Sequence, residues 1–306
     1  MTISATTHSA PPGLAIAQPL PDLLLPVKVR RGFIGFLRNH PTVAIGGGLL
    51  LLLVLIGVFA PYLGTVDPTA IAPARRTRAP SADFWFGSDA LGRDIYSRVL
   101  YGTRVSLLVG LSVAVFASLA GLAIGMVAGV VRWADGILMR FMDGLMSIPP
   151  ILLAIALMAL TRGSVGNVIM AITVAEIPRV SRLVRSVVLS LREQPYVDAA
   201  IASGTRAPMI ILRHILPNTM APMLVQATYV CASAMIVESI LSFIGAGTPP
   251  TIPSWGNIMA EGRALWQVKP YIVFFPAAFL SVTVLAVNLV GDGLRDALDP
   301  RMAKSL

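Results

Sequence analysis

Cysteine and charged residues are scarce in this chain. Charged side chains make up 13% of its 306 residues and hydrophobic ones 56%, with a mean hydropathy of +0.78. A soluble domain carries about 25% charged residues, so the shortage of charge indicates a protein whose solvent is lipid. The single cysteine, Cys231, excludes a disulfide within the chain. Because it lies in an apolar run, we expect it to pack as a small hydrophobe.

The sequence also lacks the motifs of a nucleotide hydrolase and of a metal enzyme. The dipeptide Gly-Lys never occurs, which excludes the phosphate-binding loop G-x-x-x-x-G-K-[ST]. None of the three histidines, His8, His40 and His214, has a second His or Cys at ligand spacing, so we expect no metal site. No nucleophile–base pair stands out either. We therefore expect a protein that is not an enzyme, with no catalytic residues, and we expect His214 to cap or orient a loop.

Basic residues outnumber acidic ones and give a net charge of +9. They gather beside the apolar runs, which is typical of membrane topology and of contact with anionic lipid. Since the sequence has no basic region separate from those runs, we expect no nucleic-acid partner.

Long runs without charge indicate membrane-spanning helices. A helix needs about 20 apolar residues to cross the hydrocarbon core of a bilayer. Five charge-free runs reach or approach that length, at residues 43–62, 105–131, 144–161, 215–237 and 270–291. A sixth and weaker run, over 163–178, contains Glu176. The sequence therefore predicts an all-α membrane protein with six transmembrane helices.

The basic residues also set the expected orientation. A cluster precedes the first run, and residues 1–27 contain no Lys or Arg, which predicts an uncleaved anchor with a cytoplasmic N-terminus. The arginines between 179 and 214 then lie inside, as the positive-inside rule requires, although residues 64–104 lie outside and are also rich in arginine. The predicted organisation is a cytoplasmic tail over 1–42, a first transmembrane helix over 43–63, an external loop over 64–103, a core of five helices over 104–299 and a cytoplasmic tail over 300–306.

A polar loop between two apolar runs is the most informative segment. Residues 196–218 read YVDAAIASGTRAPMIILRHILPN. Asp198 stands near the start of a short predicted helix, where negative charge is favoured, and Gly204 is a natural left-handed stop. Pro208 suits the first turn of a second helix, while Ala199 and Ala200 leave a narrow face that can enter a groove. The pattern predicts a docking loop for a partner protein, with an ordinary amphipathic connector as the alternative.

Four segments carry a resemblance to a known family. The first is DAA at residues 198–200 with Gly204 and ILP at 215–217, which resembles the EAA loop of ABC importer membrane subunits, with Asp198 in place of the usual Glu. The others are FGSDALGRD at 86–94 followed by SR, ESILSFIG at 238–245 followed by PSWG, and NLVGDGLRDALDP at 288–300. Together they are similar to the C-type permease subunit of the dipeptide, oligopeptide and nickel branch.

This resemblance implies a fold, a function and a set of partners. The fold is the transmembrane domain of a type I ABC importer in a bacterial inner membrane. The chain would form half of a pathway for dipeptides or oligopeptides, with nickel or another small solute as the alternative substrate. Its partners would be a second permease subunit, two ATP-binding subunits that hold ATP and Mg²⁺, and an external substrate-binding protein. No cofactor is expected in this chain itself.

The resemblance also assigns residues to roles. The coupling residues would be Asp198, Ala199, Ala200, Gly204 and Pro217. Candidates for the pathway or for contact with the second permease are Glu238, Ser242 and Trp255, and a structural hydrogen bond is the alternative for Glu238. The external box contributes Asp89, Gly92, Arg93 and Asp94.

Spacing within the external box predicts a local structure as well. Charge pairs should stabilise a turn there, followed by an amphipathic helix lying on the membrane surface. That turn would be either a solvated structural element or a contact for the substrate-delivering protein.

Two features leave room for other interpretations. In the family the stretch before the loop often reads W-P-x-Y-A-R, whereas residues 177–182 read IPRVSR. We expect Glu176 there to pair with Arg179 or Arg182. The rival from another class is an ion-coupled secondary transporter that uses Glu176 and Glu238, but the sequence shows no clear inverted repeat, which many such folds contain.

Overall fold

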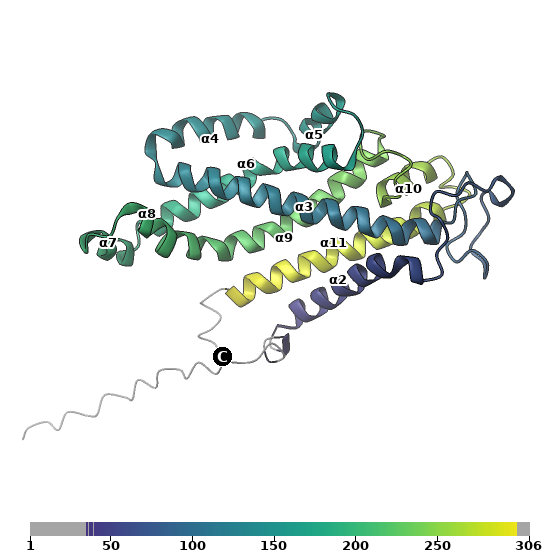
Figure 1. The fold of residues 1–306 in the computed structure, drawn as a ribbon, viewed down its shortest axis with the longest axis horizontal. Helices are drawn as coiled ribbons and strands as arrows, with labels where there is room; N and C mark the ends of the chain where they lie inside the picture. The colour runs from purple at the N-terminus through teal and green to yellow at the C-terminus, as the bar shows by residue number, and fades with distance from the viewer. Residues whose placement is uncertain (1–34, 36, 39, 299–306) are drawn as a thin grey trace, which may run out of the picture.

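Long helices run side by side along the length of the molecule (Figure 1). The computed structural model describes residue 35, residues 37–38 and residues 40–298. The long helices are α2 (Pro41–Phe59), α3 (Ile95–Val130), α6 (Val165–Arg192), α9 (Leu216–Phe243) and α11 (Tyr271–Leu298). Shorter elements join them: η1 (Ala60–Tyr62), η2 (Pro73–Arg75), α4 (Arg132–Met146), α5 (Pro150–Ala159), α7 (Pro195–Ala202), α8 (Ala207–Ile210), the π-helical turn η3 (Ile211–Ile215) and α10 (Trp255–Gly262).

Side-chain caps and a proline fix where three of the long helices begin. The carboxylate of Asp94 accepts a hydrogen bond of 2.8 Å from the N–H of Ser97 at the start of α3. The hydroxyl of Ser164 accepts one of 3.1 Å from the N–H of Asn167 at the start of α6. Both bonds satisfy N–H groups that a helix leaves unpaired in its first turn. Pro41 begins α2, where the missing N–H costs nothing.

Four helical segments among the described residues are long and apolar enough to cross a membrane. They cover Pro41–Tyr62, Ile95–Val130, Ala207–Phe243 and Tyr271–Leu298. The pair α4 and α5, bent by 86°, gives a fifth if it counts as one broken span. α6 is absent from this set, and the sequence places Glu176, Arg179, Arg182 and Arg185 in it. The all-helical membrane fold is confirmed, but the predicted count of six transmembrane helices is not.

Two boundaries differ from the prediction. The apolar run over 144–161 is not one straight helix, because α4 ends at Met146 and α5 begins at Pro150. Pro149 and Pro150 lack N–H donors and restrict the residue before each of them, and this pair of adjacent prolines breaks the helix here. α3 begins at Ile95, ten residues before the expected second span, and continues unbroken to Val130. The separate amphipathic helix expected on the membrane surface is therefore wrong.

The two ends of the bundle carry different structures (Figure 1). The loop end bears α7 and α8, and the box end bears residues 63–94 together with α10. The predicted N-terminal tail over 1–42 lies almost entirely outside the described residues, and the tail over 300–306 lies wholly outside them.

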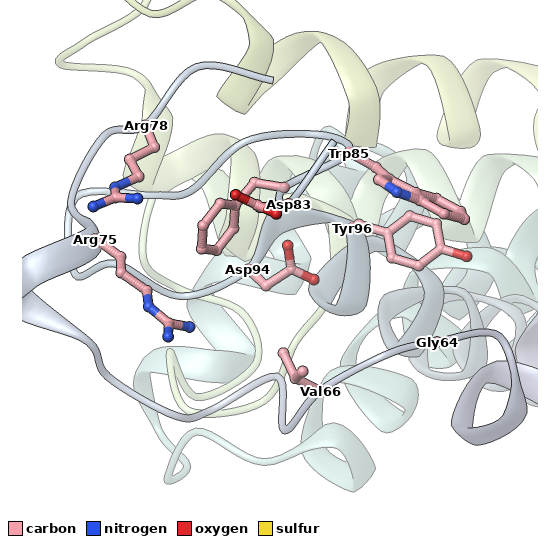
Figure 2. A pocket seen from close by; sticks show the side chains of 9 residues that line it. Gly64, Val66, Arg75, Arg78, Asp83, Trp85, Asp94 and Tyr96 are labelled. Atoms are coloured by element: carbon pink, nitrogen blue, oxygen red, sulfur yellow. The ribbon is translucent and has the colours of Figure 1, made fainter. Parts of the chain in front are cut away.

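An open pocket lies on the surface of the box end (Figure 2). Arg75 and Arg78 approach it from one side, and Trp85 and Tyr96 pack together on another, with ring centroids 4.8 Å apart. The side chain of Asp83 lies between these two groups in the view. The mixture of charges and aromatic rings makes this a polar surface, in contrast to the apolar sides of the bundle.

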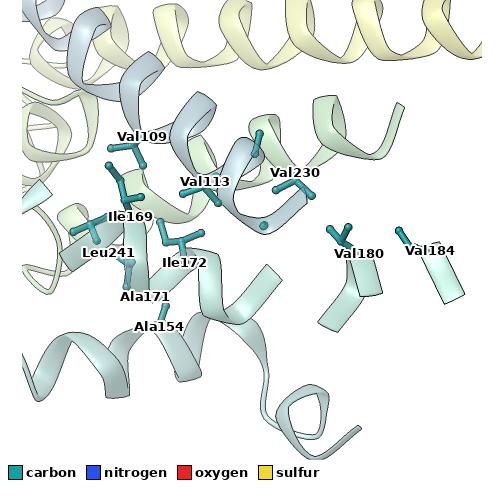
Figure 3. Packing of buried hydrophobic residues seen from close by; sticks show 14 of the residues in the cluster. Val109, Val113, Ala154, Ile169, Ala171, Ile172, Val180, Val184, Val230 and Leu241 are labelled. Atoms are coloured by element: carbon teal, nitrogen blue, oxygen red, sulfur yellow. The ribbon is translucent and has the colours of Figure 1, made fainter. Parts of the chain in front are cut away.

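The main core lies where α3, α6 and α9 meet. Val109 and Val113 of α3, Ile169 and Ile172 of α6 and Val230 of α9 are buried there (Figure 3). α3 approaches α6 closely because a row of glycines on α3 faces a row of valines on α6. The glycines are Gly121, Gly125 and Gly129, and the valines are Val180, Val184 and Val188. Small residues at such intervals let two helix backbones approach within a membrane.

α2 is held at the edge of the bundle by α11 and α3. The backbone of α11 passes so close to Gly46 that an added Cβ would lie 2.8 Å from the carbonyl oxygen of Ala286. Arg104 of α3 donates from Nη2 to the carbonyl of Val58 at 2.9 Å and from Nε to the carbonyl of Gly57. These bonds satisfy carbonyls that α2 leaves unpaired at its C-terminal end.

Candidate functional site

The polar loop predicted to dock a partner forms a compact helical turn at the loop end. α7 begins at Pro195, and Asp198 lies in its first turn as predicted. The helix ends at Ala202, after which Gly204 adopts φ +80°. Its N–H donates to the carbonyl of Ile201 at 2.9 Å, and the N–H of Thr205 donates to the carbonyl of Ala200 at 3.0 Å. This pair of bonds is the Schellman motif, which confirms the prediction of a left-handed stop at Gly204.

The second half of the loop differs from the expected short helix. Pro208 does lie in the first turn of α8, but α8 continues through the π-helical turn η3 into α9 without a break. Pro217 is the second residue of α9. Its ring would clash with the carbonyl of Arg213 in a regular α-helix, and the wider π turn just before it relieves that clash. The loop therefore consists of one separate helix, α7, joined by a tight bend to the long helical segment Ala207–Phe243.

Buried apolar contacts hold α7 against the bundle. Val197 is buried in the main core, together with Ile210 and Ile215 from the other side of the bend. The rings of Tyr196 and His214 lie 6.1 Å apart, and the amide of Asn218 donates to the carbonyl of His214 at 2.6 Å. The ring contact places the start of α7 beside His214 of η3, whereas the bond from Asn218 is local to the helix. The role of His214 in orienting the loop stays a prediction.

The opposite face of the loop is exposed and partly apolar. Asp198, Ala199 and Pro217 are exposed, whereas Ala200 is half-buried against the core. Large apolar side chains share this exposure, namely Ile201, Met209 and Leu212. A protruding helix with an exposed apolar rim, flanked by the exposed Arg206 and Arg213, is suited to binding another protein.

At the box end, the charge pairs predicted for the external box are present but buried. The Oδ2 atom of Asp89 accepts from Nε of Arg93 at 2.7 Å and from Nη1 of Arg98 at 2.6 Å. Its Oδ1 atom accepts from the N–H groups of Leu91 and Arg93 at 2.8 and 2.9 Å. Because Asp89 and both arginines are buried, the turn is structural but its charge pairs are not solvated as expected. Its contact with a substrate-delivering protein stays a prediction.

One residue that sequence spacing did not reveal completes this cluster. Glu261 of α10 binds both Arg93 and Arg98, with Oε1 accepting from Nη2 of Arg98 at 3.2 Å. Four charges therefore join the turn, the start of α3 and α10. Gly92, at φ +79°, closes the turn against the carbonyl of Ala72, where any Cβ would overlap that oxygen. Asp94 serves as the N-cap of α3 and lies beside the open pocket of Figure 2.

The candidates for the pathway or subunit contact belong to a second buried network. The hydroxyl of Ser242 donates to Oε1 of Glu238 at 2.9 Å and lies 3.1 Å from the hydroxyl of Thr248. The Nδ2 of Asn257 donates to the hydroxyl of Thr248 at 2.9 Å. Trp255 is fully buried, and its indole N–H donates to the carbonyl of Val99 at 3.1 Å. Within the described chain, Glu238, Ser242 and Trp255 thus connect α9, α10 and α3.

A charged pair also lies in the middle of the bundle. The carboxylate of Glu176 on α6 lies 3.3 Å from Nη1 of Arg179, which confirms the predicted pairing. The hydroxyl of Ser233 on α9 donates to the same carboxylate at 3.1 Å. The guanidinium of Arg179 lies over the ring of Tyr229, 5.6 Å from its centroid. Sequence reasoning missed Ser233 and Tyr229, because nothing in the spacing of the chain places α9 beside α6.

The fold and these sites define a class of protein: a multi-helix membrane protein with a helical loop that protrudes at one end. The fold is similar to a chain in the inward-facing structure of the MetNI methionine ABC transporter. The TM-score is 0.57 at 19% identity, covering 66% of this chain and 96% of that one. Residues 121–304 match the family described as binding-protein-dependent transport system inner membrane component, and the chain belongs to that family.

Relatives that match along most of their length support the same assignment. The chain is 54% identical over 265 residues to a probable peptide ABC transporter permease protein of Sinorhizobium fredii, covering 86% of this chain and 90% of that one. It is 40% identical over 267 residues to the dipeptide transport system permease protein DppC of Alkalihalophilus pseudofirmus, covering 87% and 88%. It is also 40% identical over 269 residues to the glutathione transport system permease protein GsiD of Pectobacterium atrosepticum, covering 87% and 89%.

Proposed function

We propose that this chain is a permease subunit of an ABC importer for dipeptides or oligopeptides. The three relatives named above support this substrate class, because their names are those of permeases for peptides, dipeptides and the tripeptide glutathione. The observation that carries the mechanism is the shape of the loop end. There, one short helix with an exposed face packs against the end of α6 and against α8, which continues into α9.

The proposed complex pairs this chain with a second permease subunit, and the translocation pathway lies between them. Two ATP-binding subunits dock at the loop end and hold ATP and Mg²⁺, and an external protein delivers the substrate at the box end. This arrangement makes the loop end cytoplasmic and places both termini there, in the inner membrane of a bacterium. The exposed loop arginines lie inside in this orientation, as the positive-inside rule requires.

In the same proposal the bundle crosses the membrane six times. The bent pair α4 and α5 forms one broken span, which is tolerated where neighbouring protein satisfies the freed backbone groups. α6 forms the sixth span despite its charges. Three of its arginines pair with acidic side chains: Arg179 with Glu176, Arg182 with Asp143 and Arg185 with Asp135. Paired charges at this depth face a partner or an aqueous cavity.

α7 transmits the motion of the ATP-binding subunits. Asp198, Ala199 and Ala200 sit in a cleft of the partner, while the Schellman motif at Gly204 and the π turn before Pro217 fix the angle between α7 and α9. When ATP closes the two ATP-binding subunits, a rigid helix seated in their cleft follows them. Force then passes through Val197, Ile210 and Ile215 into the core, and the pathway opens to the other side.

A site-directed crosslink tests this proposal. Ala199→Cys, in a chain whose own cysteine is removed by Cys231→Ala, places a thiol on the exposed face of α7. In native membranes we expect a crosslink to an ATP-binding subunit that changes with added ATP. The matched control is Ala82→Cys, which is exposed at the box end and should give no such product. Transport that runs on an ion gradient, with no crosslink at Ala199, would overturn the proposal in favour of a secondary transporter.

A further inference from the structure

The charged pair of α6 lies at half the depth of the bundle. Glu176 and Arg179 are close to the midpoint of α6, which has 28 residues, and Tyr229 and Ser233 are close to the midpoint of α9, also 28 residues long. A helix of that length rises about 40 Å at 1.5 Å per residue, so the four side chains lie far from either end. Ionisable residues at such depth are rare, and they mark substrate or ion pathways.

The contacts within the cluster divide it into a buried part and an open part. The side chain of Glu176 is 3% exposed and accepts the bond from Ser233. The side chain of Arg179 is 39% exposed, and Tyr229 is 55% exposed. Glu176 therefore supports the pair from behind, and Arg179 and Tyr229 form the surface that a ligand could reach.

The guanidinium of Arg179 has donors to spare. Its Nη1 faces Oε2 of Glu176 at 3.3 Å, but that oxygen makes no hydrogen bond within the described chain, and the remaining N–H groups of Arg179 have no acceptor there either. An arginine carries five N–H donors in a planar fork that matches a carboxylate. Donors left open at this depth require water or an anionic ligand.

A second ion pair shows which way this surface faces. Arg182 lies one turn nearer the loop end on α6, and its Nη2 lies 2.5 Å from Oδ1 of Asp143 on α4. Both side chains of this pair are about half exposed. The ion pairs of Arg179 and Arg182 thus form a row of exposed charges from mid-depth toward the loop end. Contact of this row with hydrocarbon would be strongly disfavoured. The row must therefore face a partner subunit or water, and the wall of a pathway between two permease subunits provides the water.

We propose that Arg179 and Tyr229 form a contact site for the carboxylate of a peptide in transit. This inference rests on the proposed function and names the part of the pathway that holds the substrate. The guanidinium binds the carboxylate through two parallel hydrogen bonds, and the ring of Tyr229 keeps the guanidinium plane in position. Glu176 is a positioning residue. Because its carboxylate lies 3.3 Å from Nη1 of Arg179 and offsets part of the positive charge, the site binds the peptide carboxylate weakly enough to release it.

Thiol labelling tests whether the surface is aqueous and selects anions. Membranes containing the whole complex with the Tyr229→Cys change, in the Cys231→Ala background, are treated with small charged methanethiosulfonate reagents. The measured quantity is the reaction rate of the negatively charged reagent divided by that of the positively charged one. We expect this ratio to be about tenfold higher with Arg179 present than after the further change Arg179→Gln. Absence of labelling at the introduced thiol would show that the face is covered by lipid or protein, and equal ratios would show that Arg179 does not attract anions; either result overturns the site.

Uptake measurements test the substrate. In proteoliposomes containing the full complex, Arg179→Gln should lower the uptake of radiolabelled dialanine about tenfold or more. Arg179→Lys keeps the positive charge but loses the planar fork of donors, so its dialanine uptake should lie between that of the wild type and that of Arg179→Gln. Arg162→Gln is the matched control, since Arg162 is an exposed arginine just before α6, and its uptake should equal that of the wild type.

The outcomes separate this inference from the proposed function. If Arg179→Gln transports dialanine normally, the site is wrong and the peptide permease stands. If Arg179→Gln instead dissociates the complex on purification, Arg179 binds a partner subunit and the site is also wrong. If the wild-type complex takes up no peptide, the proposed function fails, and the labelling ratio still decides whether Arg179 and Tyr229 form an anion site.

Discussion

Arg98 and Asp89 form a buried ion pair, with Nη1 of Arg98 2.6 Å from Oδ2 of Asp89 and both side chains 1% exposed. Arg98 belongs to the first turn of α3, and Asp89 belongs to the turn before it. Through Glu261 the same arginine also binds α10, 163 residues further along the chain. The pair therefore joins the turn over residues 89–93, the start of α3 and α10.

Removing Arg98 should destabilise the protein strongly. Arg98→Met keeps most of the side-chain volume but leaves Asp89 with a single arginine partner and Glu261 with one fewer. Breaking a buried ion pair from one side costs about 3–5 kcal/mol, so we expect a clear fall in the thermal unfolding midpoint of the purified protein. Arg76→Met is the control, because Arg76 is exposed at the same end and no ion pair involves it within the described residues. Equal midpoints for both variants would contradict the structural role of Arg98.

The close packing of α3 on α6 makes a second prediction. An added Cβ at Gly125 would lie 2.6 Å from the carbonyl oxygen of Ser181 and 2.7 Å from Cβ of Val184. Neither atom can move without shifting α6, and overpacking of this kind costs about 1–3 kcal/mol. Gly125→Ala should therefore lower the unfolding midpoint.

The matched control for this change lies on α2. Gly48→Ala adds the same atom to a helix where nothing lies within 4 Å of it. Because alanine favours helix over glycine by roughly 0.5–1 kcal/mol, this variant should be as stable as the wild type or slightly more so. A loss of stability in Gly48→Ala as large as that in Gly125→Ala would show that the close packing of α3 on α6 is not the cause.

The sequence predicted the features that depend on local chemistry. Charge-free runs revealed the apolar helices, because hydropathy over about 20 residues is a property of the segment alone. Asp198 and Gly204 marked the start and the end of α7, since caps and left-handed stops act within one turn. The spacing of Glu176 and Arg179 likewise predicted their pairing on one helix face.

What could not be predicted depends on residues far apart in the chain. Glu261 binds arginines that lie 168 and 163 positions earlier, and no spacing rule connects them. The burial of Glu238 likewise follows from the way α10 folds back over α9. The count of six spans is not confirmed for a different reason: α6 combines apolar residues with a row of arginines, and hydropathy counts those arginines against a span.

Glu238 allows its two expected roles to be separated. Glu238→Gln keeps an oxygen that accepts from the hydroxyl of Ser242, whereas Glu238→Leu leaves that hydroxyl without its acceptor. Loss of a buried acceptor costs about 1–3 kcal/mol, so Glu238→Leu should lower the unfolding midpoint and Glu238→Gln should not. Because the carboxylate is fully buried, we also expect Glu238→Gln to transport normally. A stable Glu238→Gln variant that no longer transports would instead assign Glu238 to the pathway.

The bend after α7 gives the last prediction, which concerns coupling. Gly204 has φ +80°, and an L-residue there costs about 1–2 kcal/mol, more for a β-branched side chain. Gly204→Val should break the Schellman motif and turn α7 away from its docked position. Nothing lies within 4 Å of an added Cβ, so the effect comes from the backbone and membrane insertion should be unchanged.

Gly204→Asn is the control, since asparagine tolerates the left-handed conformation. We expect peptide uptake to fall in Gly204→Val and to be retained in Gly204→Asn, measured together with ATP hydrolysis by the complex. Normal uptake in Gly204→Val would mean that the angle of α7 does not transmit the force.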